Sequence, residues 1–426
     1  MQPALLIRLS PIGPWRYGPG DGARTRVDKL FRSDRLYSAV SIALRQLEFL
    51  EEWLDATVRG SIPALTFSSL FPYQGDTLFA NPPSSLWPPS SSSVSMSSPA
   101  FLTKIRWEAP RFVPLSLIES LFTGETILAD QWIADPESGC LLRRDRPNAS
   151  PFRRTVRNFT PVDRLTKRGT HSDACACVEF EPGSGVWAVA RFADQSAEAA
   201  WKERLKAAFR LLADTGFGGR RSSGWGQMDA PEFREGTWPH LVFPKLRRAS
   251  LNGDRAGSAD NQLSLYWLLS LYSPSPEDRI DWSGGQYLPV VRGGRVESPA
   301  GSGIEKKLAR MISEGSVLAA NSEPVGAGVD VAPDGFGHPV YRSGLALALK
   351  LPVSDELAQA GPVEVPTDKD FEERPCEEPA AAEPEAGASE AEPAFAERES
   401  LPEQTAEENE PVNLEQPAND NREPEP

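Results

Sequence analysis

Apolar positions along the first 80 residues change from the spacing of a strand to that of a helix and back. The run from Ala4 to Leu9 is mostly apolar and stops before Pro11, as a buried strand does. Ser33 and Asp34 then stand where a helix N-cap is expected. Apolar residues recur beyond them at helical spacing: Leu36, Val40, Ala43, Leu44, Leu47 and Leu54. The aromatic-rich segment 62–80 is again extended, so the order strand, helix, strand predicts the opening of a ferredoxin-like unit.

Two further helices and a strand pair are predicted in the next part of the chain. The segment 112–124 favours a short helix closed by Gly124, and the segment 196–213 favours a longer amphipathic helix that ends at Gly216. Between these helices, 173–180 and 185–192 are typical of two strands paired through a turn at 182–185. The mixture of elements predicts an α+β fold.

The composition changes in the second half of the chain. Strand-like runs at 263–271, 286–292, 309–320 and 339–351 are separated by turns rich in Gly and Pro, which predicts a smaller β-rich domain. From residue 353 onward Glu, Pro and Ala dominate, and such a segment buries too little apolar surface to offset its ordering entropy. We therefore expect an N-terminal domain at 1–230 with an inserted region at about 85–170, a second domain at 231–352, and a disordered tail at 353–426.

The net charge of −15 averages two regions of opposite sign. Residues 353–426 hold 23 Asp and Glu against 4 Lys and Arg, a net of −19, which leaves 41 basic and 37 acidic residues, a net of +4, in residues 1–352. The body is mildly basic, and we interpret the acidic tail as a solubility device rather than as a mimic of nucleic acid or a screen for a basic groove.

Composition also limits the classes of function. Four cysteines and three histidines do not complete a zinc site, so we expect no metal and no cofactor. The longest apolar runs fall short of a membrane span, so we expect no membrane partner. The small number of cysteines and the lack of a signal peptide favour a cytoplasmic protein.

The most informative stretch is DTGFGGRRSSGWG at 214–226, the G-rich loop, between a predicted helix and a predicted strand. Its glycines would let backbone N–H groups approach a ligand, and its arginines carry forked donors suited to phosphate. Such a loop fits a sugar–phosphate backbone better than a base edge. Its candidate RNA-binding residues are Gly216, Gly218, Gly219, Arg220, Arg221, Ser222, Ser223, Gly224 and Gly226. The alternative is a tight bend with a surface arginine pair, and the helix-to-strand order excludes a Walker A loop or a dinucleotide fingerprint.

The G-rich loop resembles that of the RAMP superfamily of CRISPR proteins, which lies in the same helix-to-strand position. Other segments resemble the fourth Csm subunit, the Cas5-like member of type III-A effector complexes. They are KLFRSDRLYSAV at 29–40, FSSLFPYQGDTLFANPP at 67–83, RFVPLSLIESLFTG at 111–124, VDRLTKRGTHSDACACVEF at 162–180, MISEGSVL at 311–318 and HPVYRSGLALAL at 338–349. The similarity spans about residues 5 to 350 in the right order. Arg35 departs from the usual Thr, and the tail has no counterpart in the family.

The resemblance implies both a fold and a function. The fold would be a pair of tandem ferredoxin-like (RRM-like) RAMP domains with an inserted thumb. The function would be that of a non-catalytic subunit of the Csm complex, which holds the repeat-derived 5′ handle of the guide RNA (crRNA). Its partners would be the Cas10-type large subunit and the backbone RAMP that is the third Csm subunit, with target RNA met only indirectly. The analogous subunit of another type III subtype would use the same chemistry.

Two basic segments outside the G-rich loop are further RNA-binding candidates. The loop 13–32 carries Arg16, Arg24, Arg26 and Arg32, which the resemblance places at the 5′ handle. The stretch 143–168 holds nine basic residues against two acidic ones, with aromatic residues between them, a composition that neutralises phosphates and stacks on bases. The resemblance makes this stretch part of the thumb, with Arg154, Arg157 and Arg164 as candidates. The alternative for both segments is a solvated basic loop.

Catalysis is the alternative to a purely binding role. Asp34 invites comparison with the catalytic aspartate of target-cleaving RAMP proteins, but an N-cap explains Ser33 and Asp34 more simply, so we assign no catalytic residue. The competing function is a RAMP endoribonuclease that processes precursor crRNA with His171 as general base. Cys175 and Cys177 share one side of a predicted strand and are expected in the core.

Overall fold

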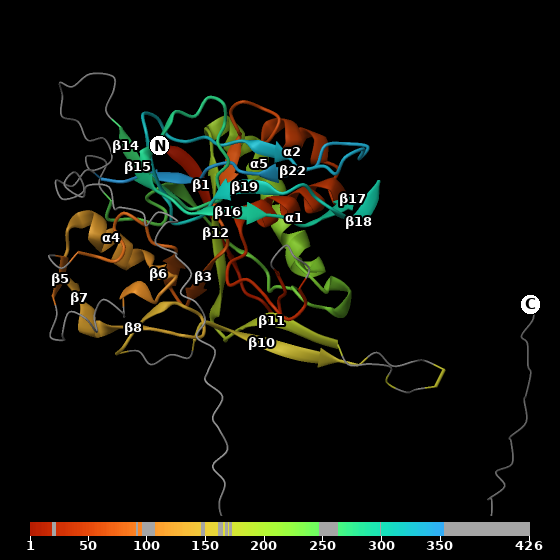
Figure 1. The fold of residues 1–426 in the computed structure, drawn as a ribbon, viewed down its shortest axis with the longest axis horizontal. Coiled ribbons are helices and arrows are strands. Elements are labelled where there is room, and N and C mark those ends of the chain that lie inside the picture. The colour runs from red at the N-terminus through yellow and green to blue at the C-terminus, as the bar shows by residue number, and fades with distance from the viewer. Residues whose placement is uncertain are drawn as a thin grey trace, which may run out of the picture. The chain divides into compact units, whose positions relative to one another are not determined.

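Figure 1 shows the computed structural model of the chain. It describes residues 1–18, 23–90, 93–95, 107–145, 150–160, 165, 166, 169, 173–246, 263–298 and 300–352. The predicted tail, Arg164 and His171 lie outside these residues. The helices are α1 (Ser33–Gln46), α2 (Leu50–Ala56), α4 (Leu115–Thr123) and α5 (Gln195–Thr215), with short 3-10 turns η2 (Ala129–Gln131) and η3 (Arg221–Ser223). None of the described helices is long and apolar enough to cross a bilayer.

The first sheet has seven strands, in the order β13-β1-β12-β3-β4-β6, with β2 also paired to β12. These strands are β1 (Gln2–Leu9), β2 (Leu65–Phe67), β3 (Phe71–Gln74), β4 (Thr77–Ala80), β6 (Val113–Pro114), β12 (Ser184–Phe192) and β13 (Glu232–Trp238). Each of the nine residues of β12 is buried, so this strand is the centre of the sheet. Because β13 pairs with β1, the first sheet extends past residue 230, where the sequence had placed the end of the first domain.

The second sheet has four strands, in the order β15-β20-β14-β23. Its strands are β14 (Ser264–Leu268), β15 (Ile280–Gln286), β20 (Val317–Ala320) and β23 (Ala348–Lys350). The segments that connect its strands form three two-stranded sheets. These are β16 (Pro289–Arg292) with β19 (Ala309–Ile312), β17 (Arg295–Ser298) with β18 (Gly301–Glu305), and β21 (Gly328–Asp330) with β22 (Tyr341–Ser343). The described residues after η3 form no helix, as the sequence predicts for a β-rich second domain.

A long insertion separates β4 from β12. It contains β5 (Val94–Ser95), β7 (Ile127–Leu128), β8 (Trp132–Ala134), β9 (Leu141–Arg143), β10 (Phe152–Phe159) and β11 (Asp173–Phe180), besides β6 and α4. The strands β10 and β11 pair over eight residues and extend away from the two sheets (Figure 1). The predicted pairing of 173–180 with 185–192 is therefore wrong. These segments are β11 and β12, and the turn between them sends the chain from the hairpin into the first sheet.

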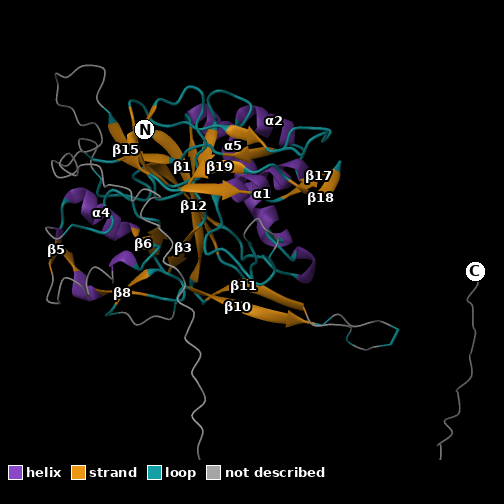
Figure 2. Cartoon of the chain, viewed as in Figure 1, coloured by secondary structure: helices purple, strands orange, loops and turns teal. Residues whose placement is uncertain are grey.

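The two faces of the first sheet are covered by different layers. Phe67 lies opposite Ala190 in the register and packs against Phe209 of α5, with ring centroids 6.3 Å apart, which makes this the helical face. Figure 2 shows α1, α2 and α5 together on one side of β1 and β12. Trp187, which points to the opposite face because side chains alternate along a strand, packs against Phe71 with ring centroids 5.6 Å apart.

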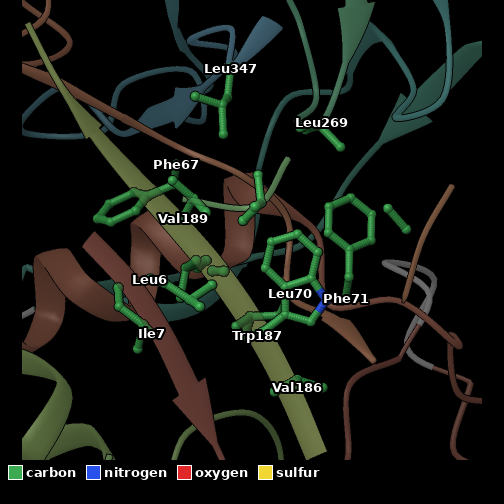
Figure 3. Packing of buried hydrophobic residues seen from close by; sticks show 14 of the residues in the cluster. Leu6, Ile7, Phe67, Leu70, Phe71, Val186, Trp187, Val189, Leu269 and Leu347 are labelled. Carbon is green, nitrogen blue, oxygen red and sulfur yellow. The ribbon is translucent and has the colours of Figure 1, made fainter. Parts of the chain in front are cut away.

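The second sheet packs on that opposite face. Leu269 and Leu347 belong to the same buried cluster as Phe71, Trp187 and Val189 (Figure 3). The neighbouring residues Tyr266, Leu268, Leu318 and Ala348 point the other way and form a cluster of their own. The two sheets therefore share one core, and the described residues from Met1 to Pro352 lie in one compact unit.

Candidate RNA-binding site

The G-rich loop is held against the N-terminal segment. After α5 ends at Thr215, the chain turns back through η3. The N–H of Gly219 donates to the carbonyl of Arg16 at 2.8 Å, and the N–H of Gly226 donates to the carbonyl of Pro14 at 3.0 Å. The Trp15 indole adds a hydrogen bond to the carbonyl of Phe217 at 2.7 Å. Two segments about 200 residues apart in the sequence thus form one surface.

Two glycines make this close approach possible. Gly218 and Gly226 have φ of 94° and 80°, a region that side chains rarely adopt. A Cβ atom on Gly218 would lie 2.5 Å from the carbonyl oxygen of Arg16, and one on Gly226 would lie 2.2 Å from that of Phe217. Both glycines therefore serve packing between protein segments. From the sequence, by contrast, we had predicted that they let the backbone approach a ligand.

The expected row of bare N–H groups is only partly present. The N–H groups of Gly219, Gly224 and Gly226 all donate to carbonyls of the protein. This part of the prediction is wrong because the loop folds on the N-terminal segment and on itself. Ser222 and Ser223 are exposed at the tip of the loop.

The two arginines of the loop have different environments. The guanidinium of Arg220 lies 4.2 Å from the ring centroid of Phe159 and 5.9 Å from that of Trp225. Phe159 and Trp225 belong to a small cluster with the buried Cys175 and Cys177, which confirms the prediction that these cysteines are core residues. Arg221 forms an ion pair with Glu297 of β17, so its charge is already matched in the protein.

The arginines of the N-terminal loop mostly hold the protein together. Arg16 donates to the carbonyls of Ala23, Arg24 and Ala176 at 2.7 to 2.8 Å. Arg24 forms an ion pair with Asp173 at 2.9 Å. Arg26 is exposed.

Arg32 also has a structural role. It donates to the buried carboxylate of Glu314 at 2.5 Å and to the Ser313 hydroxyl at 2.9 Å. Arg16 and Arg32 therefore have few donors left for RNA, contrary to the prediction.

The β10–β11 hairpin carries the remaining arginine candidates. Arg157 donates to Glu179 at 2.7 Å, and the neighbouring Arg153 faces Glu179 and Glu181. The side chain of Arg154 is exposed and makes no hydrogen bond or ion pair with any described residue. Of the two thumb candidates that the structure describes, Arg154 is thus the one with an unmatched charge.

A cavity of about 730 Å³ opens beside the G-rich loop. Its walls come from α1, the start of α2, the G-rich loop, β17 and the segment around β22. Each of its three carboxylates is paired with an arginine of the same lining: Asp34 with Arg342, Glu51 with Arg59, and Glu297 with Arg221. The other basic residues of the lining are Arg16, Arg35, Arg45, Arg295 and Lys306. The cavity therefore has an excess of positive charge, which suits an anionic ligand.

Two of these cations have no partner among the described residues. Arg35 donates to Asp28 at 3.0 Å, and Arg295 donates to the carbonyl of Gly303 at 2.7 Å. Arg45, in the last turn of α1, and Lys306, after β18, make no side-chain hydrogen bond or ion pair with a described residue. Burial and the charge of Arg342 lower the pKa of Lys306, which means that its ammonium group is incompletely solvated. Neither residue could be recognised from the sequence, because both lie far from the G-rich loop in the chain.

Asp34 is a structural residue. Arg292 donates to its carboxylate twice at 3.1 Å, and Arg342 forms a second ion pair with it. Burial would raise the pKa of Asp34, but the two arginines outweigh this effect and hold the pKa well below its usual range. The predicted N-cap is wrong, because the capping position is Arg32 and no side chain caps the helix. Ser33 accepts a hydrogen bond from the N–H of Leu271 at 3.0 Å. Both residues thus join α1 to the second half of the chain.

The structure brings a different histidine to the cavity than the one that the sequence singled out. His338 lines the cavity, with Nε2 at 2.6 Å from the Ser298 hydroxyl and Nδ1 at 2.8 Å from the Pro339 carbonyl. No group of His, Cys, Asp and Glu suited to a metal ion is found in the described part of the chain.

Comparisons with known proteins agree on one family. Residues 261–351 match the family model of the CRISPR Csm4 C-terminal domain. The chain is similar to a chain of the Csm3–Csm4 subcomplex of the type III-A CRISPR-Cas interference complex, with 15% identity, 82% of this chain and 99% of that chain covered, and a TM-score of 0.50. It is also similar to a chain of the Csm1–Csm4 cassette in complex with pppApA, with 18% identity, 83% and 99% covered, and a TM-score of 0.47. A comparison with curated proteins finds no match.

These findings test the resemblance that the sequence motifs indicated. The family model lies in the β-rich second domain and covers its main strands, from β14 to β23. The protein shares its mixed helix and sheet fold with nearly the whole of the matched chain of the Csm3–Csm4 subcomplex. The comparisons therefore confirm the resemblance to Csm4, the fourth Csm subunit and a RAMP protein of type III CRISPR systems, and residues 261–351 match the model of its C-terminal domain.

Proposed function

We propose that this chain is the crRNA-binding, non-catalytic Csm4 subunit of a type III-A Csm complex, and that the cavity beside the G-rich loop holds the 5′ handle of the guide. The observation that carries this proposal is the excess of positive charge in the cavity, with Arg45 and Lys306 unpaired among the described residues. A volume of about 730 Å³ admits a nucleotide, and two cations can neutralise its phosphates. The protein would then recognise the sequence of the handle through hydrogen bonds to the edges of its splayed bases, as is usual for single-stranded RNA.

The proposed fold of tandem ferredoxin-like domains has unequal support in the two halves. In the first half, the strands of the unit are β1, β3 (with β2), β12 and β13, and the order β13-β1-β12-β3 with α1 and α5 on one face is that of a ferredoxin-like unit. In the second half, the four-stranded sheet carries no helix among its described residues. The second ferredoxin-like domain remains a proposal that rests on the Csm4 family match.

Partner proteins are proposed on the same family match. We propose contacts with the Cas10-type large subunit and with the backbone RAMP, so that target RNA is met only through the guide, in the cytoplasm. Large apolar side chains are exposed along β15 and β16, namely Trp282, Tyr287, Leu288 and Val291. Exposed apolar surface of this kind is typical of a protein interface, and it supports a partner on the second sheet.

The proposed RNA site is tested by removing the two unpaired cations. The double variant R45Q/K306Q should bind a fluorescently labelled RNA with the repeat-derived handle at its 5′ end at least tenfold more weakly than the wild type, because each charge-assisted phosphate contact contributes about 1.5–3 kcal/mol. A matched control is K202Q/K245Q, which removes the half-buried Lys202 and the exposed Lys245, two cations that pair with Glu235 and Glu125 outside the cavity. Equal loss of affinity in both double variants would show a general charge effect and would refute the site.

A second candidate function is cleavage of precursor crRNA, and His338 is the observation that favours it. Its Nε2 atom faces a hydroxyl at 2.6 Å inside the cationic cavity, where a general base could act on RNA. Incubating the pure protein with repeat RNA separates the two functions. Binding without cleavage supports the proposed function, whereas cleavage at one position that is lost in H338A would replace it with the endoribonuclease.

A further inference from the structure

A second group of unmatched cations lies outside the cavity. Lys29 precedes α1, Arg111 precedes β6, and Arg154 lies on β10. Lys29 and Arg111 meet over Gly139: a Cβ atom built on this glycine would lie 3.2 Å from Nζ of Lys29 and 3.6 Å from Cβ of Arg111. Neither residue lines the cavity beside the G-rich loop. Three segments that are distant in the sequence thus bring positive charge to one place.

These cations make no ion pair with a described residue, although carboxylates lie in the neighbourhood, and the guanidinium of Arg111 lies 5.6 Å from the ring centroid of Phe112. Neither Lys29 nor Arg111 makes a side-chain hydrogen bond or ion pair with a described residue. The surrounding acids are occupied as follows: Asp28 pairs with Arg35 at 3.0 Å, Glu314 pairs with Arg32, and Asp135 accepts hydrogen bonds from Ser138 and Ser150. Of these acids, Asp135 has no cation partner among the described residues, so Lys29, Arg111 and Arg154 still leave this region with a surplus of positive charge.

The arrangement is unfavourable in the isolated protein. Burial and the charges of Arg154 and Arg111 lower the pKa of Lys29. Burial and the charge of Arg32 lower the pKa of Arg111. Two half-buried cations that repel each other and make no direct ion pair cost free energy, although Asp135 acts in favour of the charged Lys29 and Glu314 and Asp28 in favour of the charged Arg111. An anion placed between the two cations would relieve the repulsion.

We propose that Lys29 and Arg111 form a phosphate subsite for an RNA backbone, separate from the cavity beside the G-rich loop. An arginine fork and a lysine point charge together suit one phosphodiester group. The exposed Arg154 continues the positive charge onto β10, whereas Arg153 and Arg157 of the same strand are matched by Glu179 and Glu181. Three cations from separate segments match a run of phosphates better than a single small anion. The subsite rests on the proposed function, since it extends the path of the same RNA beyond the handle cavity.

The test uses the full chain and the variant K29Q/R111Q. Its affinity for the labelled handle RNA should fall about tenfold, and the slope of log K against log salt should become shallower by about 0.7, because the neutralisation of one phosphate of the single-stranded RNA is lost. The melting temperature should stay the same or rise, because the two cations repel each other in the wild type. A purely structural role would instead lower the melting temperature and leave the salt slope unchanged. The variant K29R/R111K, which keeps both charges, should bind within a few-fold of the wild type.

Each outcome decides between the proposals. A wild-type chain that does not bind the RNA refutes the proposed function and the subsite together. A wild type that binds, with K29Q/R111Q equal to it in affinity and salt slope, refutes the subsite alone. Titration with inorganic phosphate separates the source of the anion: thermal stabilisation by millimolar phosphate that is lost in K29Q/R111Q, with unchanged RNA affinity, would assign the site to free phosphate and overturn the RNA assignment. If the double variant fails to fold, K29Q alone carries the same comparison.

Discussion

At the scale of single residues, the charged side chains of this protein divide into those that are paired and those that are not. Arg16, Arg32 and Arg342 are used by the fold, whereas Arg45 and Lys306 are not paired with any described residue. A sequence shows where basic residues are, but pairing depends on which distant carboxylate folding brings near. The sequence therefore identified the candidate arginines of the N-terminal loop. It could not show that their charges and donors are used within the protein.

Glu297 is expected to limit RNA binding because it holds Arg221. The ion pair joins the G-rich loop to β17 at the edge of the cavity, and both side chains are partly exposed. In E297Q the guanidinium of Arg221 becomes available to a phosphate, and the handle RNA should bind about two- to fivefold more tightly, the range expected for an exposed ion pair. Fluorescence anisotropy measures the change. The control E203Q removes an exposed carboxylate that pairs with Lys206, and an equal gain there would remove Arg221 from the RNA path.

Asp34 should be among the most sensitive positions for stability. In D34N the guanidinium groups of Arg292 and Arg342 lose their buried counter-charge, and the free energy of unfolding should fall by about 3–5 kcal/mol. Urea denaturation measures this. The control E305Q, at an exposed pair with Arg295, should change stability by less than about 1 kcal/mol. A loss as small as that of the control would contradict the buried ion-pair argument.

The depressed pKa of Asp34 also makes the stability of the protein depend on pH. The folded-state pKa of Asp34 is depressed below the unfolded value of about 3.9, so its stabilisation is complete above that pH and is lost as the pH falls toward the folded pKa. The difference in unfolding free energy between the wild type and D34N should therefore be constant near neutral pH and narrow below about pH 4. Urea titrations at several pH values measure it, and a difference that widens in acid would be inconsistent with this assignment.

At the scale of secondary-structure elements, local signals were reliable where they did not depend on distant partners. Helix α5 and its end at Gly216 follow from apolar spacing and a glycine, and α4 ends at Gly124 as expected. The N-cap at Ser33 and Asp34 was wrong because these side chains satisfy Leu271 and two arginines from the second half of the chain. Likewise, β11 and β12 are close in sequence, yet the choice of strand partner is made by the sheet.

The G-rich loop provides a matched pair of glycine substitutions. In G218A the new Cβ would meet the carbonyl oxygen of Arg16 at 2.5 Å in a backbone of positive φ, so both strain and overlap destabilise the loop, by about 3 kcal/mol or more. In G224A the φ of 77° gives a similar strain, but the Cβ has space, so the cost should be about 1–2 kcal/mol. Thermal denaturation with the handle-RNA assay measures both. Equal effects of the two variants would show that close packing on the N-terminal segment does not matter.

At the scale of the whole molecule, the two sheets depend on each other. Leu269 and Leu347 complete the core over Trp187, and Asp34 of α1 forms its two ion pairs with Arg292 and Arg342 of the second half. The sequence predicted two domains because helices stop after the G-rich loop and the strands become short. It could not show that the second sheet covers one face of the first, because a continuous apolar strand such as β12 does not reveal which layer will cover each side.

This shared core predicts that the first part cannot fold without the second. In a fragment of residues 1–246, the face around Phe71 and Trp187 would be exposed, and the carboxylate of Asp34 would lose both arginines. The fragment should therefore lack near-ultraviolet circular dichroism and bind a hydrophobic dye, whereas residues 1–352 should unfold in a single transition seen equally by fluorescence and far-ultraviolet circular dichroism. A fragment 1–246 that melts cooperatively near the temperature of residues 1–352 would mean that the sheets are independent. The ion pairs of Asp34 would then be a docking contact between two separately stable domains.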